Sequence, residues 1–308
     1  MIRFGPAGWS YPDWQGVVYP DRAPKGFDPL AYLARYFDTI EVNSTFYRPP
    51  RPEVTRRWVR RVAERPDFRF TAKLWQRFTH QREEAPTADQ VDVVRAGLDP
   101  LAERNRLGAV LPLAERNRLG AVLIQFPWSF KATQRSLEWL DDVASAFSDY
   151  PLVVEVRHAS WNRPEFYRWL GERGLGFVNI DQPVFNRSLA PTAEASGRVG
   201  YVRLHGRNYE DWFREGAGRD ARYDYLYDRQ ELEPWVARIR ELAEGGSVQD
   251  VYVVTNNHYR GQAVANAIML AAMSRGQLQK APESVIEAFP EALAGLAHAD
   301  PGPQTRLI

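Results

Sequence analysis

The chain alternates between short runs rich in Val, Ile and Phe and longer stretches with the 3.6-residue periodicity of amphipathic helices. Some longer stretches open with helix-capping patterns, such as Asp28 before Pro29 and Thr87 with Gln90 three residues later. The pattern predicts repeated strand–helix units. The eight predicted strands are Ile2–Gly5, Thr39–Asn43, Phe68–Lys73, Ala121–Gln125, Leu152–Arg157, Phe177–Asp181, Tyr201–His205 and Val251–Asn256.

Eight strand–helix units within 308 residues favour an α/β fold, the TIM-like (β/α)8 barrel. The alternative is an open doubly wound sheet, which usually has about five or six parallel strands. One connection departs from the repeat, because Gln182–Gly200 contains Pro183, Pro191 and Gly197 without an apolar period. We therefore predict a barrel in which the crossover between the sixth and seventh strands lacks a full helix.

No linker divides the chain, which predicts a single barrel domain over residues 1–296 and a polar tail over residues 297–308. A last helical stretch is expected around Glu283–Leu296. The first ten residues lack the apolar stretch of a secretory signal, and no run approaches the roughly 18 apolar residues of a membrane span. We expect a cytoplasmic protein with no membrane partner.

The twelve residues Pro100–Leu111, PLAERNRLGAVL, recur unchanged at Pro112–Leu123. Twelve residues at about 100° each rotate a helix by about 120° beyond whole turns, so the two copies cannot bury the same face of one straight helix. Because the second copy runs into the predicted fourth strand, we assign the surplus to the first copy, as a helical extension or loop with little core. We expect a break at Pro112, with Leu113–Gly120 ending the helix. A recent duplication explains the repeat more simply than a duplicated binding element.

Polar residues two positions apart share one face of several predicted strands, while apolar residues occupy the other face. Parallel strands covered by helices are usually apolar on both faces, so these polar residues need ionic partners, water or a ligand. An ion-pair network that fills the barrel is one interpretation. We favour a pocket, because these residues lie toward strand C-termini, where barrel enzymes place their active sites. The pairs are Glu41 and Asn43, Thr71 and Lys73, Glu155 and Arg157, Asn179 and Asp181, and Arg203 and His205.

The predicted pocket combines proton-transfer groups with cations and amides. We take His205, Glu155 and Asp181 as candidate catalytic residues, because His titrates near neutral pH and burial can raise a carboxyl pKa toward it. Lysine and arginine side chains would clamp an anionic group and stabilise charge in the transition state. The candidate substrate-binding residues are Glu41, Asn43, Tyr47, Lys73, His80, Gln125, Arg157, Trp161, Arg203 and Asn256.

Two interpretations of the ligand remain open. Carboxylates and a histidine could hold a divalent metal ion, whereas the neighbouring cations would repel one unless a phosphate lay between them. We therefore expect no metal site and no cofactor, with a divalent metal as the alternative. The absence of Cys excludes disulfides, thiolate nucleophiles and Cys-based metal centres. The candidate metal ligands are Glu41, Glu155, Asp181 and His205.

The 40 basic and 39 acidic residues nearly cancel, so net charge singles out no class of partner. Aromatic residues after several strands, including Phe46 and Trp128, could stack a base or sugar or seal the barrel mouth. The arginines between Arg56 and Arg65 lie on a predicted helix opposite Trp58, as is typical of a solvated outer face. We expect a small anionic ligand or nucleotide as partner, with nucleic acid less favoured.

Ordered motifs along the chain resemble one known family. They are GxxGWSYPDWxGVVYP at Gly5–Pro20, FDTIEVNSTFYRPP at Phe37–Pro50, FTAKLWQRFTH at Phe70–His80, LIQFPWSF at Leu123–Phe130, VVEVRHASW at Val153–Trp161, YVRLHGR at Tyr201–Arg207 and VYVVTNNHYRGQAVANA at Val251–Ala267. Together they resemble the YecE-like family, domain of unknown function 72, over roughly Ile2 to Met273. The resemblance implies a cytoplasmic TIM-like barrel but no established reaction or catalytic residue. The tandem repeat departs from the family pattern, which has one such segment before the fourth strand.

We therefore expect an enzyme that acts on a phosphorylated or otherwise anionic small molecule or nucleotide, by acid–base chemistry of the hydrolase or lyase type. Two alternatives are a metal-dependent phosphodiesterase acting on nucleic acid and a non-catalytic ligand-binding or regulatory protein. The sequence has no Walker loop, Rossmann glycine pattern, HExxH motif or nucleophile elbow, which excludes chemistry by those routes.

Overall fold

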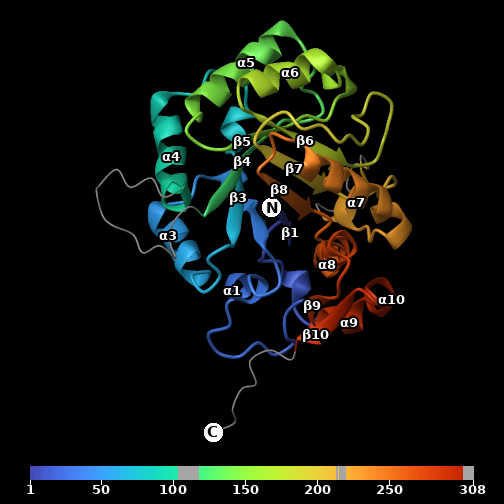
Figure 1. Ribbon diagram of the computed structural model, residues 1–308. Coiled ribbons are helices and arrows are strands. Elements are labelled where there is room, and N and C mark those ends of the chain that lie inside the picture. Colours follow the sequence, from blue (N-terminus) through green and yellow to red (C-terminus); the bar gives the residue numbers. More distant parts are fainter. Residues whose placement is uncertain (103–117, 213, 215–219, 301–308) are drawn as a thin grey trace.

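The computed structural model describes residues 1–102, 118–212, 214 and 220–300. Its centre is a parallel eight-stranded barrel surrounded by helices (Figure 1). Each strand coincides with a predicted one to within two residues at either end, which confirms the TIM-like (β/α)8 fold. The strands are β1 (Ile2–Pro6), β2 (Thr39–Val42), β3 (Arg69–Lys73), β4 (Leu119–Gln125), β5 (Leu152–Glu155), β6 (Gly176–Asp181), β7 (Val199–Leu204) and β8 (Asp250–Thr255).

The strands are hydrogen-bonded in the order β1-β8-β7-β6-β5-β4-β3-β2. The seam between β1 and β2 is joined by a bridge from Ala7 to Glu41, and Gly8 N–H donates to the Glu41 carbonyl at 2.8 Å. Gly5 permits this close approach, because a Cβ at that position would overlap the Thr39 carbonyl group. The barrel is therefore nearly closed.

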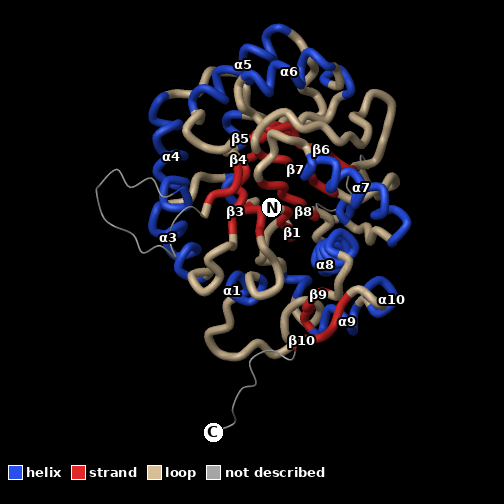
Figure 2. The backbone as a smooth tube through the Cα atoms, in the orientation of Figure 1, coloured by secondary structure: helices blue, strands red, loops and turns tan. Residues whose placement is uncertain are grey.

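Helices cover the outside of the barrel (Figure 2). Asp28 caps the first of them by accepting hydrogen bonds from Leu30 N–H and Ala31 N–H. No helix among the described residues is long and apolar enough to cross a membrane. The helices are α1 (Pro29–Leu33), α2 (Ser44–Tyr47), α3 (Pro52–Arg61), α4 (Ala88–Ala102), α5 (Gln134–Ala146), α6 (Pro164–Glu172), α7 (Arg229–Glu244), α8 (Gln262–Arg275), α9 (Glu283–Ala288) and α10 (Pro290–Leu293). Short 3-10 turns occur at η1 (Pro12–Trp14), η2 (Gln76–Phe78), η4 (Ala159–Trp161), η5 (Ala221–Tyr223) and η6 (Tyr259–Gly261).

The connection between β6 and β7 has no helix, as predicted. Residues 182–198, all of them described, form turns and extended chain. The Asn179 side chain on β6 anchors this segment, because its Oδ1 accepts from Glu194 N–H at 2.8 Å and from Thr192 Oγ1 at 2.7 Å. Side-chain hydrogen bonds therefore hold the crossover against β6 without a helix.

Large side chains fill the part of the barrel interior away from the strand C-termini. The rings of Tyr201 and Tyr252 stack with their centroids 6.0 Å apart. Gly120 lies where the register between β3 and β4 shifts, and a Cβ there would overlap the Tyr252 phenol. Because this part of the interior is occupied, the space for a ligand lies at the C-terminal ends of the strands.

A small parallel sheet follows the barrel. Its strands are β9 (Gln279–Pro282) and β10 (Ala297–Asp300), with α9 and α10 between them. The single helix expected around Glu283–Leu296 is two short helices, because Pro290 cannot donate the hydrogen bond that would continue the first. Residues 297–300 of the expected tail form β10, and Arg35 binds Asp300 at 2.7 Å. Residues 301–308 lie outside the described part of the chain.

The two copies of the tandem repeat contribute to different elements. Pro100–Ala102 of the first copy form the last turn of α4, and Leu101 is fully buried. The end of the second copy forms the first part of β4, and Arg118 N–H donates to the Leu101 carbonyl at 2.8 Å. The first copy therefore does contribute to the core, and the helix end expected at Leu113–Gly120 is wrong from Leu119, where β4 begins. The break expected at Pro112 lies outside the described residues.

Candidate functional site

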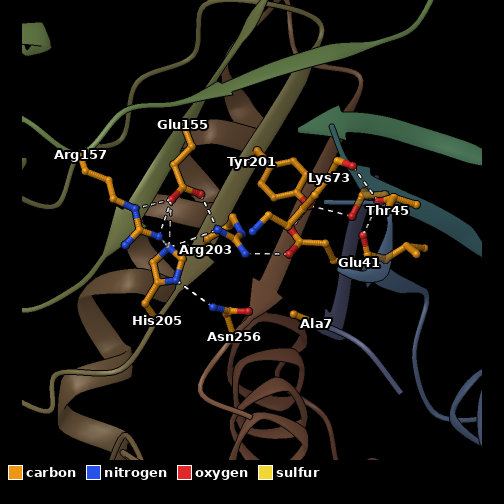
Figure 3. A network of polar contacts seen from close by, with 12 residues as sticks. Ala7, Glu41, Thr45, Lys73, Glu155, Arg157, Tyr201, Arg203, His205 and Asn256 are labelled. Atoms are coloured by element: carbon orange, nitrogen blue, oxygen red, sulfur yellow. Dashed lines mark hydrogen bonds and ion pairs between the residues drawn. The ribbon is translucent and has the colours of Figure 1, made fainter. Parts of the chain in front are cut away.

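Arg203 on β7 lies between two carboxylates at the C-terminal end of the barrel interior (Figure 3). Its Nη2 is 2.7 Å from Glu41 Oε1, and its Nη1 is 2.5 Å from Glu155 Oε2. None of the three side chains is more than 1% exposed. One guanidinium therefore links β2, β5 and β7 through the barrel interior.

Arg157 and His205 extend this network from Glu155. Arg157 Nη2 is 2.8 Å from Glu155 Oε1 and 3.2 Å from His205 Nε2. Asn256 Nδ2 is 3.0 Å from His205 Nδ1 on the other edge of the ring. Both imidazole nitrogens therefore have polar neighbours, which orient the His205 ring.

Tyr201 contacts the same network from the filled part of the barrel. Its hydroxyl donates to Glu41 Oε2 at 2.9 Å and lies 2.7 Å from Thr71 Oγ1. Burial and the Glu41 charge raise the pKa of Tyr201 well above its ordinary value, so the hydroxyl remains a proton donor. Tyr201 lies two residues before Arg203 on β7, so both side chains point to the same face. The strand pattern that indicated Arg203 could therefore also have indicated Tyr201.

The charges of the network determine its protonation. Burial alone would raise the pKa of Glu155, but Arg203 and Arg157 outweigh it and hold that pKa well below its ordinary value. Burial, reinforced by the two arginines, lowers the pKa of His205 to about 3. Glu155 is thus ionised and His205 neutral at pH 7. The prediction that these groups titrate near neutral pH is wrong, because the arginines stabilise the carboxylate and disfavour a cationic imidazole.

A cavity of about 770 Å³ opens beside this network at the C-terminal mouth of the barrel. Amide groups, aromatic rings and cations line it, and no carboxylate of a described residue does so. Two of the lining arginines have carboxylate partners behind the wall, since Arg157 binds Glu155 at 2.8 Å and Arg214 binds Asp211 at 2.7 Å. The basic lining residues are Lys73, His80, Arg157, Arg214, Arg222 and His258.

Lys73 is the last residue of β3 and is partly buried in the cavity wall. Its Nζ lies 4.3 Å from the centroid of the Phe46 ring, and no described carboxylate forms an ion pair with it. Burial, with the charge of Arg203 acting in the same direction, lowers the pKa of Lys73 to about 7. Ordinary lysines titrate near 10.4, so Lys73 exchanges its proton much closer to neutral pH than they do.

His80 packs edge-on against Phe46, with the ring centroids 4.9 Å apart. Its Nδ1 is 2.9 Å from Thr79 Oγ1. Burial and the nearby charge of Lys73 lower the pKa of His80 to about 4. His80 is therefore neutral at pH 7 and offers the cavity a hydrogen-bonding ring without a charge.

A second aromatic group in the cavity wall comes from loops after β1, β7 and β8. The Tyr11 and His258 rings stack with centroids 4.4 Å apart and an interplanar angle of 11°. The Tyr223 ring is 4.7 Å from His258 on the same wall. These rings present flat surface to a ligand, in addition to the charged groups.

The structure brings eleven of the thirteen predicted site residues to this end of the barrel. Those lining the cavity are Asn43, Tyr47, Lys73, His80, Gln125, Arg157 and Asn256. Those in the buried network are Glu41, Glu155, Arg203 and His205. Trp161 and Asp181 are not part of either group.

Asp181 lies between β6 and the region of α7, away from the cavity. Its carboxylate binds Arg207 Nη2 at 2.6 Å and accepts from the Tyr227 hydroxyl at 2.9 Å and from the Trp235 indole. These partners compensate its buried charge without a ligand. The prediction that Asp181 is a catalytic residue in this pocket is therefore wrong.

The reason is that β6 presents its apolar residues to the barrel interior. Val178 is in register with Tyr201 and Ile180 with Arg203, so these pairs share the inner face. Asp181 alternates to the outer face. Both faces of a barrel strand are covered, so alternation shows which residues share a face but not which face is inside.

Trp161 belongs to the core and not to the cavity. It is fully buried, its indole N–H donates to the Phe130 carbonyl at 2.7 Å, and its ring packs against Phe130 and Phe166. The η4 turn directs the side chain inward. An aromatic residue just after a strand can take either direction, and its position alone could not decide between them.

Several residues that line the cavity were not predicted, because nothing in the sequence except their position after a strand indicates a place in the site. The loops after β6 and β7 supply many of them, and irregular loops have no periodicity from which a side chain's direction could be predicted. The residues missed are Gln76, Pro127, Gln182, Ser188, Trp212, Arg214, Arg222 and Tyr223.

The alternative metal site does not form from its four predicted ligands. Asp181 lies elsewhere, and Arg203 binds both Glu41 and Glu155. Among the residues that the structure describes, no group of three His, Asp or Glu side chains is placed to hold a metal ion. The carboxylates here neutralise arginines.

The fold and the site define a TIM-barrel-like α/β protein with a cationic cavity above a buried ion-pair network. The model of a family described as a protein of unknown function, DUF72, matches residues 3–290. The chain belongs to the DUF72 family, which confirms the resemblance found in its motifs.

Relatives of known sequence or structure support this membership. The UPF0759 protein YunF of Bacillus subtilis (strain 168) is 30% identical over 283 residues, covering 86% of this chain and 92% of that protein. The UPF0759 protein YecE of Escherichia coli (strain K12) is 29% identical over 208 residues, 63% of this chain and 64% of YecE. The crystal structure of a DUF72 family protein from Thermotoga maritima MSB8 is 32% identical, with a TM-score of 0.73 over 89% of this chain and 99% of that one.

Proposed function

We propose that this protein is an enzyme that binds a small molecule with a phosphate or carboxylate group in the cavity at the C-terminal end of the barrel. One observation carries the proposal. Lys73, Arg157 and Arg222 line a single cavity, and no carboxylate of a described residue lies in its wall. An anionic group in this cavity would therefore gain charge-assisted hydrogen bonds without first displacing an acidic side chain.

Arg157 is the best-oriented anion ligand of the three. Glu155 binds its Nε at 3.0 Å and its Nη2 at 2.8 Å, which fixes the plane of the guanidinium. The side chain is still 16% exposed and lines the cavity. Glu155, His205 and Arg203 thus act as positioning residues behind Arg157.

Proton transfer in this site would fall to Lys73. His205 and Glu155 are fully buried, and neither lines the cavity. Lys73 does line it, and its pKa of about 7 lets the ammonium donate a proton and the amine accept one at neutral pH. We therefore assign acid–base chemistry to Lys73 and anion binding to Arg157 and Arg222.

Calorimetric titration of inorganic phosphate and glucose 6-phosphate tests the binding. Arg222→Gln should weaken affinity about tenfold, because one charge-assisted hydrogen bond is lost. Arg168→Gln is the matched control, since Arg168 is exposed on α6 and does not line the cavity. Equal affinity in the wild type and Arg222→Gln would contradict the assigned site.

Catalysis needs a separate measurement. Phosphorylated and carboxylated metabolites that raise the melting temperature should be incubated with the protein and followed by NMR. Conversion of at least one, lost in Lys73→Met, is the expected result. Binding without conversion across the panel would make the protein a ligand-binding protein and not an enzyme.

A further inference from the structure

The place of Lys73 in the barrel is that of a reacting group. It ends β3 at the C-terminal face, where barrel enzymes carry their catalytic side chains, and its side chain lines the cavity. Figure 3 shows this side chain directed toward Arg203. A ligand in the cavity therefore has access to Nζ.

The charges around Lys73 disfavour an additional cation. In addition to burial, the charges of Arg203 on β7 and of Arg157, two residues after β5, both lower the pKa of Lys73. Glu41 and Glu155 also lie near, but both carboxylates are already bound by Arg203. The Phe46 ring covers Nζ on another side at 4.3 Å. The face of this ring attracts an ammonium, so the activation comes from burial and from the neighbouring arginines, an environment in which enzymes use lysine as a nucleophile.

We propose that Lys73 forms an imine with the carbonyl carbon of its substrate, an aldehyde or ketone that also bears a carboxylate or phosphate group. The anionic part of this substrate class rests on the proposed function, whereas the imine rests on Lys73 and its surroundings. Arg157 stands two strands from Lys73, about 10 Å between backbones, so a short molecule could reach both.

The reaction balances without any further reactant. The lone pair of the neutral Nζ attacks the carbonyl carbon, and the carbonyl π electrons move to oxygen, which takes up a proton. The resulting carbinolamine loses that oxygen as water, and Nζ becomes the nitrogen of a protonated imine. The overall change is amine plus carbonyl compound plus one proton, giving an iminium ion and one water.

The protonation of Lys73 supports this role over that of a simple anion clamp. With a pKa of about 7, about half of the Lys73 side chains carry a free lone pair at pH 7. An ordinary lysine with a pKa near 10.4 offers a lone pair in only about one molecule in a few thousand. A permanent clamp needs a permanent charge, which the arginines of the cavity already supply.

Reductive trapping tests the proposal on the intact protein. The probes are pyruvate and dihydroxyacetone phosphate with sodium cyanoborohydride at pH 7, and peptide mass spectrometry locates the adduct. The chain contains only four lysines, and Lys25, Lys131 and Lys280 are exposed, so they serve as internal references. Trapping at Lys73 should be at least about tenfold faster than at any of them and half-maximal near pH 7.

Variants separate the amine from its surroundings. Lys73→Arg keeps a cation but should lose the cavity adduct, whereas Lys280→Arg should leave the trapping unchanged. Circular dichroism shows whether Lys73→Arg folds. If it does not, the trapping rate at Lys73 relative to the other three lysines of the wild type still tests the proposal. Adducts spread evenly over all four lysines, or confined to the exposed ones, would overturn the imine proposal.

Phosphate binding distinguishes this proposal from the proposed function. Inorganic phosphate should slow trapping by dihydroxyacetone phosphate at Lys73 if the anion binds in the same cavity. Selective trapping without phosphate binding would uphold the imine and overturn the anionic substrate. Phosphate binding with unselective trapping would uphold the anion site and overturn the imine.

Discussion

Arg203 Nη1 lies 2.5 Å from Glu155 Oε2, and neither side chain is more than 1% exposed to solvent. Such a pair gains attraction in a medium of low polarity but costs desolvation of both charges. The pair therefore stabilises the fold only while both partners are present, because either charge alone would remain buried without compensation. Because Arg203 also binds Glu41, its loss would leave Glu41 buried without the arginine that pairs with it, and Glu155 with Arg157 alone.

Arg203→Met should lower the free energy of unfolding by about 3–5 kcal/mol, as expected when one partner of a buried ion pair is removed. Urea denaturation of the variant and the wild type measures this. Adding Glu41→Gln should recover part of the loss, since the uncompensated carboxylate is then gone. The control is Arg173→Met, which removes a solvent-exposed ion pair with Asp141. This substitution should lower the free energy of unfolding by less than about 1 kcal/mol. Equal stability of the two arginine variants would refute the role given to Arg203.

Removing one copy of the tandem repeat should leave the fold intact. The resulting chain is the same whichever copy is deleted, and three residues, Glu-Arg-Asn, then join Ala102 to Arg118. The hydrogen bond from Arg118 N–H to the Leu101 carbonyl would span six residues, as in the Schellman motif that commonly ends helices. Circular dichroism and thermal melting of the shortened chain should show a cooperative transition. A non-cooperative melt would mean that the additional twelve residues are required.

Stability should fall as pH decreases below 6.5, in part through His205. The folded pKa of His205 is about 3 and the unfolded value about 6.5, so between these values the unfolded state binds the extra proton. This group alone costs about 1.4 kcal/mol per pH unit in that window. Urea unfolding at pH 6.5 and 4.5 should show that His205→Asn loses about 2–3 kcal/mol less than the wild type. His298→Asn, at an exposed site, should behave as the wild type; the same loss in both variants would count against a neutral buried His205.

Lys73 should change stability in the same direction as His205, but in a more alkaline window, because both groups have a lowered pKa in the folded state. Its folded pKa of about 7 lies below the ordinary value near 10.4, so the folded state must hold an unfavourable charge below pH 7. This cost is fully present below pH 7 and disappears as pH rises toward 10.4. Lys73→Met should therefore be more stable than the wild type at pH 6, with a smaller difference at pH 9.5. Urea melts at both values test this, and a difference independent of pH would contradict a lowered pKa; Lys280→Met is the exposed control.

The barrel could be predicted because its strands obey a simple spacing rule. Glu41, Glu155 and Arg203 each sit between apolar neighbours near a strand C-terminus, and parallel strands bring such ends together. The strand pattern offers an ion-pair network and a pocket as alternatives, yet the structure has both. Arg157 belongs to both, because one edge of its guanidinium binds Glu155 and its side chain also lines the cavity.

The incorrect predictions about site residues have a common physical cause. The local sequence pattern does not determine which way a side chain points or which charges surround it. Asp181 obeys the alternation but faces outward, because Arg207 and Trp235 compensate its charge there. Arg222 lies in η5, a single short turn with no periodic pattern from which the direction of its side chain could be predicted. The pKa values of Lys73 and His205 depend on arginines from other strands, so no segment of sequence alone contains them.

The network beneath the cavity has a consequence for how this protein could diversify. Two carboxylates and two guanidiniums, from Glu41, Glu155, Arg157 and Arg203, cancel one another within the barrel. The positive character of the mouth therefore depends strongly on residues outside the strands such as Arg222, which is exposed and carries little of the burial that stabilises the strands. Substitutions outside the strands can change the charge of the mouth at little expense to folding, so that charge and the stability of the barrel are free to evolve separately.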